Sequence, residues 1–120
     1  MLYPYEFILD ALFPIQLRHH RMFGVDAFYY EEKIVFALRE KDKNPHDNGI
    51  WIATKLEHHE QLKKQIKDVR IIKDFGPKTW MLLPADSDHF EEGMIKVSEL
   101  IKEHSELIGN VPKPKKKKCK

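Results

Sequence analysis

Seven histidines are the residues of this chain best suited to chemistry, because a neutral imidazole can bind a metal ion or carry a proton near neutral pH. A zinc site needs three or four ligands that converge at a fixed spacing. The adjacent pairs cannot chelate alone, since neighbouring side chains point to opposite faces of a strand and diverge by about 100° on a helix. The sequence therefore predicts surface histidines, with no metal and no other cofactor. The seven are His19, His20, His46, His58, His59, His89 and His104.

The carboxylates and the thiol are explained without catalysis. Asp86, Asp88, Glu91 and Glu92 have the chemistry of a general acid and base. Their place at the start of an expected helix accounts for them, because the helix dipole favours negative charge there. Cys119 lies among lysines in a segment expected to be disordered, where a nucleophile has no fixed geometry. We therefore expect no catalytic residues and a protein that is not an enzyme.

The net charge of +2 conceals a division between the body of the chain and its end. Residues 1–108 hold 15 basic and 19 acidic side chains, so the body is mildly acidic. The end could neutralise several phosphates, with binding that ignores base sequence and weakens in salt. The preferred interpretation is a solvated, solubilising end. The excess positive charge comes from Lys113, Lys115, Lys116, Lys117, Lys118 and Lys120.

A length of 120 residues predicts one domain, placed at residues 1–109, followed by a disordered lysine-rich tail at residues 110–120. No stretch approaches the roughly 18 apolar residues of a membrane span. The first residues lack the basic region of a signal peptide, and a single cysteine permits no internal disulfide. We therefore expect a cytoplasmic protein without a membrane partner.

Hydrophobic periodicity and turn residues predict three helices and six strands. The Thr54–Glu57 spacing is that of a capping box, and Asp88 with Glu91 predicts a second capped start. The predicted class is α+β, a two-layer fold with an antiparallel sheet of five to six strands, in the order α-β-β-β-β-α-β-β-α. The helices are expected over Tyr3–Phe13, Lys55–Ile66 and Asp88–Ile108, and the strands over Arg18–Phe23, Ala27–Tyr30, Ile34–Arg39, Gly49–Ala53, Arg70–Lys73 and Thr79–Leu83.

The central strands are apolar on both faces. Ile34, Phe36 and Leu38 are expected to point one way, with Val35 and Ala37 pointing the other. If the helices cover one face only, the second apolar face would bind a partner, often another copy of the chain. The alternative is that the first helix closes the second face. The candidate interface residues are Tyr29, Val35, Ala37, Trp51 and Trp80.

Two segments carry a family resemblance that covers about residues 18–109. Arg21-Met22-Phe23-Gly24, an aromatic hairpin and Lys33-Ile34-Val35-Phe36-Ala37-Leu38 together resemble the N-terminal domain of TfoX/Sxy proteins. Val69-Arg70, Lys78-Thr79-Trp80 and a closing helix that ends at Ile108 resemble the MmcQ/YjbR proteins. The chain departs from the pattern at Val25, where the family has glycine, and at His104-Ser105, where it has Ser-Tyr.

The resemblance implies a two-layer fold like that of the secretion-chaperone-like group. It also implies a link to competence regulation, from the TfoX side, and to DNA binding, from the YjbR side. We expect a small binding or regulatory module that acts through protein–protein contact, as a homodimer or with another protein. One alternative is non-specific nucleic-acid binding by the lysine tail. Another is a ligand-binding protein or enzyme with a pocket on the sheet, lined by Tyr29, Tyr30, His19 and Lys78.

Overall fold

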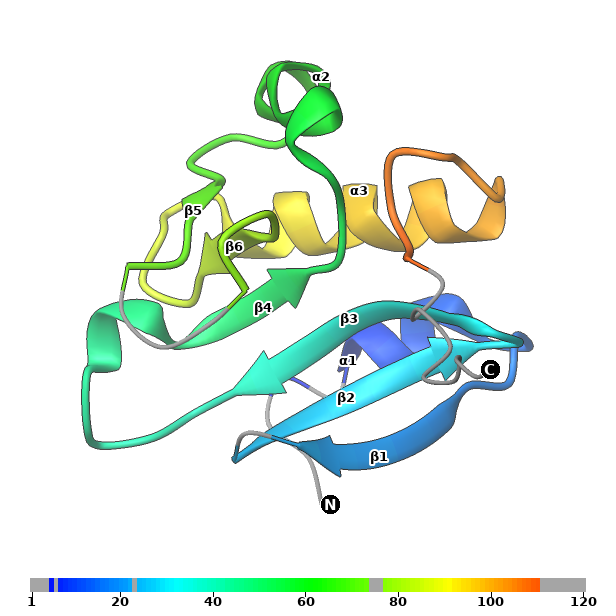
Figure 1. Ribbon diagram of the computed structural model, residues 1–120, viewed down its shortest axis with the longest axis horizontal. Helices are drawn as coiled ribbons and strands as arrows, with labels where there is room; N and C mark the ends of the chain where they lie inside the picture. Colours follow the sequence, from blue (N-terminus) through cyan, green and yellow to red (C-terminus); the bar gives the residue numbers. More distant parts are fainter. Residues whose placement is uncertain (1–4, 6, 23, 74–76, 111–120) are drawn as a thin grey trace, which may run out of the picture.

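Six strands form one antiparallel sheet within the part of the chain that the structure describes (Figure 1). The computed structural model describes residue 5 and residues 7–22, 24–73 and 77–110. The order across the sheet is β1-β2-β3-β4-β6-β5, so that most neighbours are consecutive in the chain. The expected α+β class and antiparallel sheet are confirmed. Among the described residues, no helix has the length and apolar character needed to cross a membrane.

Each strand begins and ends within two residues of its expected position. The strands are β1 (Arg18–Met22), β2 (Val25–Tyr30), β3 (Lys33–Arg39), β4 (Gly49–Ile52), β5 (Arg70–Ile71) and β6 (Met81–Pro84). The helices are α1 (Phe7–Leu12), α2 (His59–Gln65) and α3 (Phe90–Lys102), with short 3-10 helices η1 (Pro45–Asp47) and η2 (Leu56–His58).

Helices α1 and α3 lie against one face of the sheet and contact each other (Figure 1). The predicted apolar stripe of the last helix is buried there, including Met94, Val97 and Ile101. It packs with Phe36 and Ile50 from the sheet in one core cluster. Burying each such side chain contributes roughly 1.5–3 kcal/mol, so this layer supplies most of the stability.

Gly93 allows α3 to approach the sheet closely. A Cβ atom at this position would lie 2.8 Å from Leu83 Cδ2 and 3.1 Å from Ile66 Cγ2. Contacts that short would require the Leu83 side chain to shift, so glycine fits at this position without repacking of its neighbours.

The opposite face of the sheet carries a second apolar cluster, which includes Val25, Ala27, Ala37, Trp51 and Leu82. Trp51 is 2 % exposed, and its indole N–H donates to the Asp47 carbonyl at 2.9 Å. Both faces of the central strands are therefore apolar, as expected, and both are buried in the chain.

A β-bulge in the pairing of β2 with β3 changes the face of the sheet to which two side chains of β3 point. The register between β2 and β3 shifts at Phe28/Tyr29, so that Phe28 pairs with Phe36 and Tyr29 pairs with Ile34. Val35 is the extra residue and joins the helix-side core, whereas Ile34 joins the opposite cluster. We expected side chains in β3 to alternate strictly between the two faces of the sheet, and for Ile34 and Val35 this is wrong. The extra residue of a bulge interrupts the two-residue alternation of side chains along a strand.

The predicted capping box at Thr54 is also wrong. The Thr54 hydroxyl donates to the Leu107 carbonyl at 2.7 Å, and Lys55 is the residue that precedes η2. A buried hydroxyl needs one partner, and a carbonyl from the last turn of the domain supplies it in place of a local amide. The expected second helix is present as two elements, η2 and α2.

The last helix is shorter at both ends than its expected range Asp88–Ile108. His89 precedes α3 without a side-chain cap, and the amide of His89 donates instead to Ser87 Oγ at 2.9 Å. At the other end His104 takes φ 58°. The Ser105 amide donates to the Leu100 carbonyl at 2.9 Å and the His104 amide to the Ile101 carbonyl at 3.0 Å. This is a Schellman motif, which ends a helix.

The loop after β3 is closed by a buried arginine. Arg39 is 9 % exposed, and its guanidinium donates to the carbonyls of Asn44 at 2.9 Å and Lys43 at 2.7 Å. It also donates to Asn48 Oδ1 at 2.7 Å. In the same loop, the buried Asp47 carboxylate accepts from the Lys73 amide at 3.1 Å. We call Arg39, Asp47 and Asn48 the loop cluster.

Candidate functional site: a pocket at the β2–β3 hairpin

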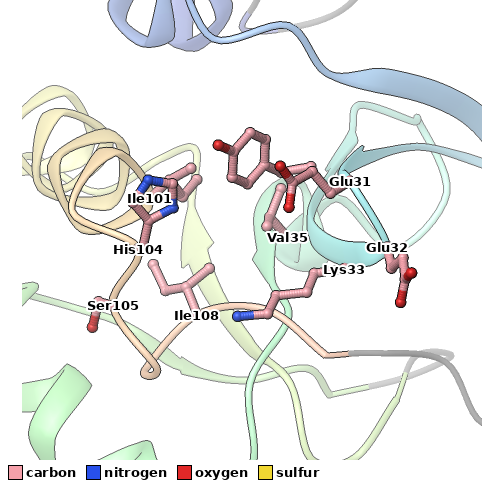
Figure 2. A pocket seen from close by; sticks show the side chains of 9 residues that line it. Glu31, Glu32, Lys33, Val35, Ile101, His104, Ser105 and Ile108 are labelled. Atoms are coloured by element: carbon pink, nitrogen blue, oxygen red, sulfur yellow. The ribbon is translucent and has the colours of Figure 1, made fainter.

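A pocket of about 500 Å³ lies between the turn of the β2–β3 hairpin and the end of α3 (Figure 2). We call it the hairpin pocket. Its volume falls in the range of small-molecule sites, roughly 300–1,000 Å³. It brings together two segments about seventy positions apart in the sequence. The lining residues are Tyr30, Glu31, Glu32, Lys33, Val35, Ile101, His104, Ser105 and Ile108.

One wall of the pocket is a tight turn. Tyr30 pairs with Lys33, so Glu31 and Glu32 alone connect the two strands. Two-residue hairpin turns need positive φ in at least one of their central residues, which usually selects glycine or asparagine. Glu31 takes this conformation with φ 57°. The turn therefore holds a long acidic side chain where a small residue is the ordinary choice.

The other wall is the end of α3, where the same feature occurs. His104, with its positive φ, occupies the position of the Schellman motif that glycine usually fills. Its ring lies 5.4 Å from the Tyr30 ring, centroid to centroid, at an angle of 30°. The two walls are thus joined across the mouth by an aromatic contact.

The floor of the pocket is apolar. Val35, Ile101 and Ile108 are each no more than 4 % exposed. Val35 reaches the floor because the bulge turns it to the helix side. Ile108 reaches it because the chain turns back after α3 instead of continuing as a helix. The pocket is therefore apolar below and polar around its rim.

The rim carries charges of both signs that have no ion-pair partner. Within the described residues, the side chains of Glu31, Glu32 and Lys33 form neither an ion pair nor a hydrogen bond. Figure 2 shows the Glu31 carboxylate and the Lys33 ammonium at the pocket, with Glu32 directed away from it. Exposed charges at fixed backbone positions can bind an external group of opposite charge.

The arrangement does not resemble a nucleophilic catalytic site. Ser105 Oγ accepts a hydrogen bond from the Leu107 amide at 3.1 Å. Figure 2 shows this hydroxyl turned away from the His104 ring, so the pair lacks the contact that activates a serine. In the ranges that the structure covers, no group of three His, Cys, Asp or Glu side chains is placed to hold a metal ion.

The segment after α3 holds the pocket in place. The Gly109 amide donates to the Ala53 carbonyl at 2.7 Å, and Asn110 exchanges two backbone hydrogen bonds with Ile34. The Asn110 side chain also donates to the Thr54 carbonyl at 3.0 Å. Asn110, which the sequence placed in the tail, is therefore bound to the sheet. On the far side of this segment lies a second hollow of about 540 Å³, which shares Lys33 with the hairpin pocket.

A second exposed feature is the edge strand β1. It is the end strand of the sheet and pairs only with β2 among the described strands. Its first four residues, Arg18, His19, His20 and Arg21, are mostly exposed, with His19 partly covered. Asp26 on β2 lies 2.8 Å from His19 Nε2 and 3.5 Å from Arg21 Nη1. Asp26 thus pairs with two of the four basic side chains of β1, His19 and Arg21, and Arg18 and His20 point to the other face of the strand.

The residues that the sequence singled out as an interface are mostly inside the chain. Val35, Ala37, Trp51 and Trp80 are between 1 % and 7 % exposed. Tyr29 is half-buried, with the Arg18 guanidinium 4.7 Å from the centre of its ring. The six lysines of the tail and Cys119 lie outside the described residues.

Only one member of the predicted pocket set lines the hairpin pocket. Tyr30 does so, whereas Tyr29, His19 and Lys78 lie elsewhere. Sequence reasoning missed Glu31, Lys33 and His104 as a group, because each lies in a turn whose spatial neighbour is far along the chain. The one available signal was His104-Ser105, which stood out as a departure from the resembled family.

The fold and the site together define an α+β protein with a six-stranded antiparallel sheet and a polar-rimmed pocket at one hairpin. Comparisons with models of known protein families, with curated proteins and with solved structures find no match to this chain.

Proposed function

We propose that this chain is a non-enzymatic binding module, of the TfoX N-terminal and YjbR type, that contacts a partner protein through edge strand β1. The observation that carries the proposal is the exposure of β1 at the end of the sheet. In an edge strand every second residue turns its N–H and C=O away from the sheet. An extended segment of a partner can pair with these groups as an added strand.

The side chains of β1 favour an acidic partner segment. Arg18 and Arg21 carry fixed positive charge, and His19 and His20 add more as the pH falls. Asp26 offsets part of this charge from the neighbouring strand. The row is basic although the body of the chain is acidic, so it would attract and orient a segment of opposite charge.

A second copy of the chain is the alternative partner, and β1 suits it less well. A symmetric antiparallel pair centred on His20 would set His19 opposite Arg21 and His20 opposite itself. Like charges directly opposite one another destabilise a strand pair. A homodimer would therefore have to use another surface. Light scattering on the full chain measures the oligomeric state, and cross-linking with mass spectrometry locates any interface. A stable dimer that is cross-linked through β1 contradicts the charge argument.

The test uses two extended ten-residue peptides, one alternating Glu with Val and the other alternating Lys with Val. Fluorescence anisotropy should show binding of the acidic peptide, weakening as salt rises from low concentration to about 0.5 M. His20→Glu should weaken this binding, because it adds a negative charge in the middle of β1. Gln61→Glu, the matched control, adds the same charge on the exposed side of α2 and should leave binding unchanged.

Two results would contradict the proposal. One is equal binding of the basic and acidic peptides, which would show that the charge of β1 selects nothing. The other is equal loss in His20→Glu and Gln61→Glu, which would show that only the overall charge matters.

A further inference from the structure

The hairpin pocket has the composition of a site for a molecule with two opposite charges and an apolar body. We propose that it binds a small zwitterion with an aliphatic side chain, for which a branched α-amino acid is the simplest representative. The proposal concerns a different surface from β1, so it stands or falls independently of the proposed function. It rests on the rim charges, the apolar floor and the fixed geometry of the two walls.

The rim charges set the polar requirement. Glu31 would attract an ammonium group, and Lys33, two residues away across the turn, would attract a carboxylate. Neither side chain has an ion-pair partner among the described residues, so no internal contact must be broken before a ligand binds. A purely anionic ligand would meet Glu31, and a purely cationic one would meet Lys33. A ligand that carries both charges satisfies the two together.

The floor sets the apolar requirement. Val35, Ile101 and Ile108 come from β3, α3 and the segment after it, and they form a continuous part of the helix-side core. An aliphatic side chain placed on them is removed from water on one side, which favours binding in proportion to the apolar area covered. A ligand with two charges and no side chain would leave the floor uncovered.

The walls are held in conformations that other residue types adopt more easily. Glu31 and His104 are two of the five non-glycine residues with positive φ in the described chain, and both line this pocket. Unfavourable backbone conformations persist where the surrounding structure enforces them, and they gather at binding sites. Here the two turns present a carboxylate and an imidazole at the pocket, which glycine at either position could not do.

The test is a titration of the full ¹⁵N-labelled chain, followed by NMR, with four probes. L-leucine has both charges and the aliphatic body, leucinamide lacks the carboxylate, N-acetyl-leucine lacks the ammonium, and glycine lacks the body. Leucine should shift the amide signals of residues 30–35 and 101–108. Its affinity should exceed that of glycine about tenfold, and that of each singly charged analogue about fivefold, since exposed charge pairs contribute little more.

Two variants and a matched control test whether Glu31 and Lys33 bind the two charged groups of leucine. Glu31→Gln and Lys33→Met should each lower the affinity for leucine about fivefold. Glu103→Gln removes a carboxylate from an exposed position at the end of α3 that does not line the pocket, and it should leave the affinity unchanged. The dispersion of the NMR spectrum verifies that each variant is folded.

Three results would overturn the proposal. The first is the absence of leucine-dependent shifts at residues 30–35 and 101–108. The second is binding of leucinamide or N-acetyl-leucine as tight as that of leucine, because one of the two charges would then be unused. The third is a loss in Glu103→Gln equal to that in Glu31→Gln, which would indicate attraction to the negative charge of this region as a whole and not a site.

Discussion

Strand β3 begins and ends with a cation, and the surroundings of the two cations are opposite. At its end, Arg39 is buried and donates to three oxygen atoms within the loop that follows β3. At its start, Lys33 is exposed at the rim of the hairpin pocket and has no ion-pair partner among the described residues. The same kind of charge on the same strand is satisfied internally at one end and left available at the other.

The difference separates polar groups that support the fold from polar groups that can bind something else. The acceptors around Arg39 are two carbonyls and an amide oxygen that the loop itself supplies, so the cluster is complete without a ligand. The charges around Lys33 have no such complement within the described chain. Four experiments test whether this contrast holds, from the largest expected effect to the smallest.

Arg39→Met should have the largest effect. It removes the three hydrogen bonds that the charged Arg39 guanidinium donates to the loop after β3. This loss should lower the free energy of unfolding by about 2–3 kcal/mol. Urea denaturation measures this loss. Lys33→Met, at the other end of β3, keeps the apolar stem and should change stability by less than about 0.5 kcal/mol. Equal losses of unfolding free energy in the two variants would show that Arg39 and Lys33, at the two ends of β3, do not differ in their contribution to the fold.

Asp47→Asn should have the next largest effect. The carboxylate is 2 % exposed at the side chain, and Arg70 Nη1 lies 3.5 Å away. Loss of its charge should cost about 1–2 kcal/mol, measured by thermal unfolding. Asp86→Asn, at an exposed position, should change stability by no more than about 0.5 kcal/mol. A melting temperature equally low in both variants would contradict a supporting role for Asp47.

Tyr5 lies near Arg39 and Glu40 at the end of β3, and its ionisation should make the stability of the protein depend on pH above neutrality. Burial, and then the nearby Glu40 carboxylate, raise the pKa of Tyr5 from 10.0 to about 12. The unfolded chain therefore loses this proton first, so the stabilisation is complete below pH 10 and is lost as the pH rises toward 12. Tyr5→Phe should lack this part of the decline in the unfolding free energy. An identical decline in both proteins would show that Tyr5 ionises normally.

His104→Gly should have the smallest effect, and of opposite sign. Glycine adopts a positive φ without the steric cost that histidine bears, although the unfolded chain gains freedom and the contact with Tyr30 is lost. The net result should be a gain of about 0.5 kcal/mol in stability, since the steric cost removed slightly exceeds the entropy added. Leucine binding should weaken in the same variant.

The matched control for this variant is Glu103→Gly, one residue earlier. Glu103 lies in the ordinary right-handed helical region. Glycine there relieves no strain and only adds freedom to the unfolded chain, so stability should fall by about 0.5–1 kcal/mol. Urea denaturation measures both variants, and stabilisation by both would argue against strain at His104.

Much of the secondary structure followed from local pattern. Aromatic and β-branched runs bounded by turn residues identified β2, β3 and β4, and the helical spacing of Met94, Val97 and Ile101 identified α3. The capping box at Thr54 failed for a reason that no local pattern contains. Its hydroxyl is bonded to Leu107, 53 residues further along the chain.

The candidate site was predicted least well. Glu31-Glu32 was correctly expected to be a turn, but the turn alone does not show that it faces the end of α3. The helix was expected to continue to Ile108, which would have carried His104 and Ile108 along its axis. Instead His104 adopts a left-handed conformation, and the chain returns across the sheet to Asn110. The hairpin pocket exists because of that reversal.

The sequence by itself determined the α+β class, the antiparallel pairing of neighbouring strands and the apolar character of both sheet faces. These properties depend on residue types at short, regular spacings. Only the tertiary structure decided which charges of the described residues are paired and which have no partner among those residues. That outcome depends on contacts between segments that are distant in the sequence. Arg39 and Lys33 belong to one short strand, but the loop after β3 surrounds Arg39 and the hairpin pocket lies beside Lys33.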